Sequence, residues 1–177
     1  INLILVETDK DGSKAKKVKK FISNNKLKEK YDFIFIDCPP TISVYTDAAL
    51  IASDFYLVPI RIDRYSILGI KLLKQVIDRL DDNESIGIKP LGIVYTMVKE
   101  LSQKTVQLKN TFESTEIVQE IGMFENMTSQ VNDLLVGLQG NIASKYKKSR
   151  EDIDAICKEF LERIEKYEVW CKKYEII

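Results

Sequence analysis

Apolar residues along the chain form two kinds of pattern: short continuous runs, and longer stretches with helical spacing. The short runs predict strands and lie at residues 2–7, 32–37, 55–60 and 88–97. The helical patterns lie at about residues 13–23, 43–52, 65–81, 100–114, 128–136 and 149–175. Because strands that alternate with helices are typical of parallel sheets, we expect an α/β fold. The sheet is expected to be mostly parallel and doubly wound, flanked by helices, in a single domain over residues 1–177.

The predicted last helix has a clear start and a clear buried face. Ser149 and Asp152 have the spacing of a capping box, which indicates that the helix begins there. After them, apolar residues recur at intervals of three and four: Ile153, Ile156, Phe160, Ile164, Tyr167 and Cys171. This stripe predicts one helix face packed against a core.

The run at residues 32–37 ends in a carboxylate and is followed by a pair of prolines. A continuous apolar run of this length predicts a strand buried on both faces, as in a parallel sheet. Asp37 then lies at the carboxyl end of the strand, where open α/β sheets bind their ligands. A carboxylate there suits hydrated Mg²⁺, because hard cations prefer oxygen ligands. Pro39 and Pro40 cannot continue a strand ladder, so the chain must leave the sheet at once.

Four motifs in order over residues 31–97 resemble the ParA/Soj/MinD family of deviant-Walker P-loop ATPases. Residues 31–41 (YDFIFIDCPPT) resemble its Walker B and switch II segment, and residues 47–54 (DAALIASD) resemble the helix that follows. Residues 56–60 (YLVPI) and 66–70 (SILGI) are similar to its next strand and helix. Residues 91–97 (LGIVYTM) resemble a further strand, which ends near the base of the nucleotide. The plasmid partition ATPases of the ParA branch look most similar.

The phosphate-binding loop of that family is missing from this sequence. No Gly-Lys-Ser or Gly-Lys-Thr occurs, and the seven glycines are scattered. A P-loop needs successive backbone N–H groups around the phosphates and a lysine that reaches them. Since the first residue is Ile1, we expect the chain to be the carboxyl-terminal part of a longer ATPase domain. On its own it is not expected to hydrolyse ATP.

Residues 1–13 can be aligned with the family in two ways. They resemble the switch I strand, which ends in a pair of aspartates like Asp9 and Asp11. Alternatively, residues 2–5 match a later strand just upstream of Walker B, and the two aspartates are turn residues. The second alignment needs the smaller deletion and is favoured.

The amino-acid composition excludes several classes of catalytic site and of binding partner. The chain has 27 basic and 27 acidic residues, so its net charge does not attract polyanions. It has no histidine, which excludes Ser-His-Asp catalysis and zinc hydrolysis. Three widely spaced cysteines indicate a reducing compartment and no disulfide framework. No apolar run is long enough to span a membrane, so we expect a soluble protein.

The resemblance implies an enzyme that binds ATP and Mg²⁺, dimerises in its ATP-bound form and then binds DNA without sequence preference. It also implies a role in plasmid or chromosome segregation, a centromere-binding partner protein, and a cytoplasmic, nucleoid-associated location without membrane contact. One alternative is a non-enzymatic interaction module of the same fold, and another is a MinD-like ATPase that positions cell division. A P-loop in the sequence upstream would favour the ATPase over the interaction module.

The residues carried over from the resemblance fall into three groups. Asp37 and Pro39 are expected beside the nucleotide, with Asp37 holding a water of the Mg²⁺ shell. Thr96 is expected near the base, although many relatives have an asparagine there. The DNA-binding candidates are Lys145, Lys147, Lys148 and Arg150, with the lysines between residues 14 and 20 as a second cluster.

The polar residues after the proline pair have two interpretations. In a switch loop, Thr41, Ser43 and Thr46 would respond to the γ-phosphate. As ordinary helix-capping residues, Thr41 or Ser43 would begin the helix at residues 43–52. Both interpretations can hold together.

Overall fold

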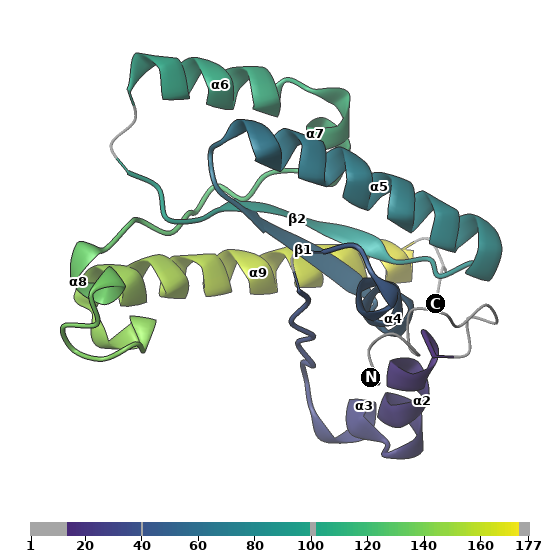
Figure 1. Ribbon diagram of the computed structural model, residues 1–177. Helices are drawn as coiled ribbons and strands as arrows, with labels where there is room; N and C mark the ends of the chain where they lie inside the picture. The colour runs from purple at the N-terminus through teal and green to yellow at the C-terminus, as the bar shows by residue number, and fades with distance from the viewer. Residues whose placement is uncertain (1–13, 40, 100–101, 174–177) are drawn as a thin grey trace, which may run out of the picture. The chain divides into compact units, whose positions relative to one another are not determined.

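The computed structural model describes residues 14–39, 41–99 and 102–173 (Figure 1). The chain divides into two compact units. The first unit comprises Ile1–Tyr56 and Ile70–Lys89, and the second comprises Leu57–Gly69 and Pro90–Ile177. The predicted strand at residues 2–7 lies outside the described residues. The expectation of a single domain stays a prediction.

Two of the predicted strands form and pair in parallel, which confirms the α/β class (Figure 1). They are β1 (Phe55–Ile60) and β2 (Lys89–Tyr95). The N–H of Lys89 donates to the carbonyl of Asp54 at 3.0 Å, and the N–H of Thr96 donates to that of Ile60 at 2.7 Å. The register therefore advances in the same direction along both strands. Residues 91–95 of β2 are all buried, as expected of a strand covered on both faces.

An irregular segment of the second unit, residues 122–130, continues the pairing with β2. Parallel bridges join Ile93 to Met123 and Val98 to Ser129. The N–H of Ile93 donates to the Gly122 carbonyl at 2.8 Å, and the N–H of Phe124 donates back to Ile93 at 2.8 Å. Segment 122–130 thus satisfies backbone groups of β2 without forming a regular strand.

The helices of the first unit agree with the predicted patterns except for the short α3, which was not predicted. They are α2 (Lys17–Asn24), α3 (Leu27–Lys30), α4 (Val44–Ala52) and the carboxyl-terminal part of α5 (Arg64–Glu84). Ser43 begins α4, because its side chain accepts a hydrogen bond from the N–H of Tyr45 at 3.3 Å. The core of this unit contains Ala15, Leu50, Ile51, Val76, Ile77, Leu80 and Ile88.

The second unit differs more from the predicted patterns. Its helices are α6 (Gln103–Glu113), α7 (Glu116–Ile121), α8 (Asn132–Leu135), the 3-10 turn η1 (Ala143–Lys145) and α9 (Lys147–Lys173). Helix α7 was not predicted, and the helix expected at residues 128–136 is reduced to α8. The prediction that Ser149 and Asp152 form a capping box at the start of the last helix was also wrong. Helix α9 begins before Ser149, and Asp152 is buried within it, where its carboxylate accepts the N–H of Ser129 at 2.7 Å.

The strand predicted at residues 32–37 does not form, and its predicted burial was wrong. The structure assigns no strand to this segment. Phe33, Ile34 and Phe35 are exposed, and Phe35 is 75% accessible. The apolar run indicates only that burial would be favourable; a strand buried on both faces also requires neighbours that cover it. In the part of the chain that the structure describes, these side chains are not covered.

We expect the isolated 177-residue chain to self-associate through this segment. Four large apolar residues with high strand propensity lie exposed close together: Tyr31, Phe33, Ile34 and Phe35. Such segments pair with other chains when they are accessible. Light scattering after size exclusion should detect dimers or larger species, and Phe35→Lys should shift them toward monomer. Val169→Lys, which replaces an exposed apolar residue of α9, serves as the control. A monodisperse wild-type monomer would contradict this prediction.

Candidate nucleotide and metal site

Asp37 and Pro39 lie together in the exposed segment that precedes α4 in the first unit. Both side chains are open to solvent. Cys38 is an exposed residue, but partial desolvation of its thiol, and then the negative charge of Asp37, raise the pKa of that thiol. Cys38 therefore stays a neutral thiol beside Asp37 at the end of this segment.

The segment after the prolines is fixed by the start of α4. Thr46 is buried, and its hydroxyl donates to the carbonyl of Thr41 at 2.7 Å. Together with the Ser43 cap, this bond explains the local geometry by helix capping alone. A switch function for Thr41 and Ser43 stays a prediction.

Thr96 lies where the sequence places it, at the carboxyl end of β2, but in the second unit. Its N–H and its hydroxyl both donate to the carbonyl of Ile60, at 2.7 and 3.0 Å. The hydroxyl thus joins the ends of the two parallel strands. Met97 follows with a positive φ of 54° and donates its N–H to the Thr128 hydroxyl at 3.0 Å. This edge of the sheet is where parallel α/β folds bind ligands.

The acidic residues fit a site for hydrated Mg²⁺, which needs few protein ligands. Among the described residues, no group of three or more His, Cys, Asp or Glu side chains gathers to hold a metal ion. A cage built entirely from protein side chains is therefore not formed there. Hydrated Mg²⁺ instead needs one or two carboxylates together with waters and substrate phosphates. An exposed carboxylate such as Asp37 fits that role, with the phosphates of a nucleotide supplying the remaining oxygens.

The four DNA-binding candidates lie at one end of α9. Lys145 ends η1, and Lys147, Lys148 and Arg150 lie in the first turns of α9, all exposed. No acidic residue lies in the first turn of α9, the end that also carries the positive partial charge of the helix dipole. Cations there disfavour the helix slightly and favour an anion as ligand.

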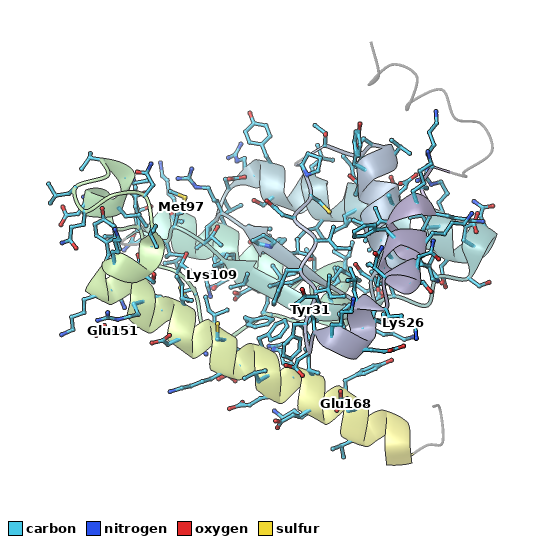
Figure 2. The ribbon with its side chains drawn as sticks, turned by 90° about the horizontal axis from the view of Figure 1, so that it is seen from below. Lys26, Tyr31, Met97, Lys109, Glu151 and Glu168 are labelled. Atoms are coloured by element: carbon cyan, nitrogen blue, oxygen red, sulfur yellow. The ribbon has the colours of Figure 1, made fainter. Side chains whose placement is uncertain are left out.

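The four cations differ in their partners. The ammonium of Lys148 lies 2.8 Å from the carboxylate of Asp152, which raises the lysine pKa. Lys147 is 3.9 Å from Glu151, a residue labelled in Figure 2. No ion pair involves Lys145 or Arg150 among the described residues. These two are therefore better able to contact a phosphate.

Sequence reasoning missed a buried polar network on α9. The Glu159 carboxylate accepts the N–H groups of Glu125 and Asn126 at 2.9 and 3.0 Å, and the side chain of Asn126 at 2.9 Å. Arg163 donates to Glu159 at 2.8 and 3.0 Å, to the Leu91 carbonyl at 3.1 Å and to the Met123 carbonyl. The network ties α9 to β2 and to segment 122–130. The network leaves no periodic pattern in the sequence, because most of its partners are backbone groups, which every residue type has.

One glycine is a sequence signal that could have indicated this network. Gly92 lies inside β2 with a φ of +144°. A Cβ there would lie 2.8 Å from the Phe124 ring and 3.0 Å from the Arg163 guanidinium, which stacks 4.2 Å from the centre of that ring. A glycine inside a strand often marks such a close approach.

Comparison with known proteins agrees with the motifs. Residues 1–89 match the family model described as an AAA domain, which is half of the chain. A chromosome-partitioning ATPase Soj of Treponema pallidum is 30% identical over 89 residues, or 49% of this chain. A chromosome partitioning protein ParA of Myxococcus xanthus is 37% identical over 71 residues, or 40% of this chain. The chain therefore belongs to the ParA/Soj/MinD family.

The fold has a counterpart among solved structures. The ATP complex of a Cyanothece McdA variant superimposes with a TM-score of 0.68, over 87% of this chain and 57% of that one. Its sequence identity is 18%, so the likeness shows the fold alone. The chain spans 35% of the Treponema relative and 25% of the Myxococcus relative. No described helix is both long and apolar enough to cross a membrane.

Proposed function

We propose that this chain is part of a ParA-type partition ATPase, which couples the binding and hydrolysis of ATP to dimerisation and DNA binding. The observation that carries this is the motif at residues 31–41, which lies within the family match to residues 1–89. Two of the similar proteins are a chromosome-partitioning ATPase Soj and a chromosome partitioning protein ParA, which supports the same process.

In this proposal Asp37 holds a water in the Mg²⁺ shell, and Pro39 begins the loop that responds to the nucleotide. Thr96, at the end of β2, contacts the base through its backbone carbonyl or methyl group, since its N–H and its hydroxyl are both bonded to Ile60. The ATP-bound homodimer binds DNA, a centromere-binding protein acts on it, and the assembly is located at the nucleoid in the cytoplasm. The test is whether Mg·ATP makes the full-length protein dimerise and bind non-specific DNA, measured by light scattering and fluorescence anisotropy.

The DNA contact leads to a specific expectation. Replacing both Lys145 and Arg150 with alanine in the full-length, ATP-bound protein should weaken DNA binding at every sequence. Because each lost phosphate contact removes a slope of about 0.9, the plot of log affinity against log salt should flatten by about 1.8. The measurement is a salt titration followed by anisotropy.

A matched pair from the other basic cluster provides the control. Lys19 and Lys20 lie exposed on α2, and replacing both removes the same charge. If DNA binds at the start of α9, this second variant should keep the wild-type salt slope. A flattened slope for the α2 pair with an unchanged slope for the α9 pair would move the DNA contact to α2.

A further inference from the structure

The backbone just after β2 is strained at Met97. This residue has a positive φ of 54°, a left-handed conformation that is costly for a residue with a side chain (Met97 is labelled in Figure 2). Two other described non-glycine residues have a positive φ, Lys26 and Ser85, and each comes within two residues of a helix end, where that conformation is common. Met97 instead follows a strand. Strained residues persist where the surrounding structure fixes them, and they are frequent at ligand sites.

Thr128 fixes the turn at Met97 through all three of its hydrogen-bonding groups. Its N–H donates to the carbonyl of Tyr95 at 3.0 Å, and its carbonyl accepts the N–H of Val98 at 2.9 Å. Between these two bonds, its hydroxyl accepts the N–H of Met97 at 3.0 Å. One residue therefore holds the backbone at the strained position and on both sides of it.

The segment that carries Thr128 is itself anchored. The N–H of Ser129 donates to the buried carboxylate of Asp152 on α9 at 2.7 Å. The N–H of Gln130 donates to the Val98 carbonyl at 2.9 Å. All of these residues belong to the second unit. Because α9 holds the segment in place, Thr128 can set the geometry of the turn.

We propose that Thr128 is a positioning residue for the base of the bound nucleotide. The inference rests on the proposed function, in which Thr96 contacts the base through its backbone carbonyl or methyl group. The Thr96 carbonyl and the Met97 N–H belong to the same peptide unit, which is planar. The hydrogen bond from the Met97 N–H to the Thr128 hydroxyl therefore also fixes the direction of the Thr96 carbonyl.

The test compares Thr128→Val with Thr128→Ser in the full-length protein. Valine has the shape of threonine without the hydroxyl, whereas serine keeps the hydroxyl. Thr128→Val should weaken Mg·ATP binding about 3- to 10-fold, the size expected for one hydrogen bond, and speed amide hydrogen exchange at Met97. Thr128→Ser should restore both toward the wild type. Binding of inorganic tripolyphosphate with Mg²⁺ should be unchanged in both variants, because this probe has no base.

Two controls separate the base side of the site from the phosphate side and from stability. Asp37→Ala should weaken binding of both Mg·ATP and tripolyphosphate, because its proposed role is at the metal. Thr111→Val should change neither, since its hydroxyl bonds only locally in α6, to the Gln107 carbonyl at 2.9 Å.

Three results would overturn the positioning role while the proposed function stands. They are an unchanged Mg·ATP affinity in Thr128→Val, an equal loss of ATP and tripolyphosphate binding in that variant, and unchanged amide exchange at Met97. Absence of Mg·ATP binding by the wild type would instead overturn the proposed function, and the positioning role with it.

Discussion

Replacing Glu159 with leucine should lower the free energy of unfolding by about 3 kcal/mol, a larger effect than most single substitutions. The carboxylate is buried and accepts hydrogen bonds from two backbone N–H groups, from Asn126 and from Arg163. Leucine would leave these N–H groups unpaired, and the Arg163 guanidinium would keep no carboxylate beside it. Urea unfolding at neutral pH measures the change.

Glu162→Leu is the control, because it makes the same substitution on the exposed face of α9. Its effect should stay within about 0.5 kcal/mol. Equal effects for Glu159→Leu and Glu162→Leu would show that the network adds nothing beyond the helix itself.

The dependence of stability on pH gives a second test of the Glu159 carboxylate. Burial would raise the pKa of Glu159, but hydrogen bonds from Asn126, Glu125 and Arg163 outweigh it and hold the pKa below its ordinary value of 4.5. A lowered pKa contributes stability that is fully present above about pH 4.5 and is lost as the pH falls through the folded-state value. Glu159→Gln should therefore be less stable than the wild type at neutral pH, and the difference should shrink in acid.

Sequence patterns predicted the elements whose signals are local. Strand β1 and helix α4 were found because a short apolar run and a Ser43 cap need no distant partner to be recognised. The run at residues 32–37 has an equally strong pattern and failed as a strand, because hydrophobicity does not say which neighbours are present. Among the described segments, β2 is instead the strand with the expected burial on both faces.

On α9 the prediction failed in the opposite way, because polar residues expected in solvent are buried. The apolar stripe predicted its orientation, and Ile153, Ile156 and Phe160 are indeed half-buried. The more deeply buried positions are polar, at Asp152 and Glu159, and a periodicity argument assigns such residues to solvent. They can be buried because segment 122–130 presents N–H groups to them, and those contacts are separated by more than 20 residues. Patterns of local spacing do not detect contacts of that kind.

Of the predicted site residues, those placed by strand ends are the easiest to interpret. Thr96 is at the end of β2 as expected, since a buried run that stops at a polar residue marks the edge of a sheet. The basic cluster could be placed on α9, but its ion pairs with Glu151 and Asp152 could not be predicted from composition. For Asp37 the sequence predicts a chemical role, and the role needs a functional test.

In the full-length protein, Asp37→Ala should weaken Mg·ATP binding by about 10- to 100-fold, the effect expected of a group that orients the metal shell through water. ATP-driven dimerisation should fail with it, and DNA binding should be lost through the missing dimer. The melting temperature without nucleotide should hardly change, because the side chain is exposed and contributes nothing to a core. Calorimetric titration with Mg·ATP and thermal unfolding of the same samples measure both effects.

Asp32→Ala provides the matched control, since Asp32 is an exposed aspartate at the other end of the same segment. It should keep wild-type nucleotide affinity, because only a carboxylate at the carboxyl end of the Walker B-like segment lies beside the phosphates in this proposal. If Asp37 instead has a purely local structural role, the pattern reverses: Mg·ATP affinity is kept and the melting temperature falls. That result would mean that the motif at residues 31–41 records ancestry without a working metal site.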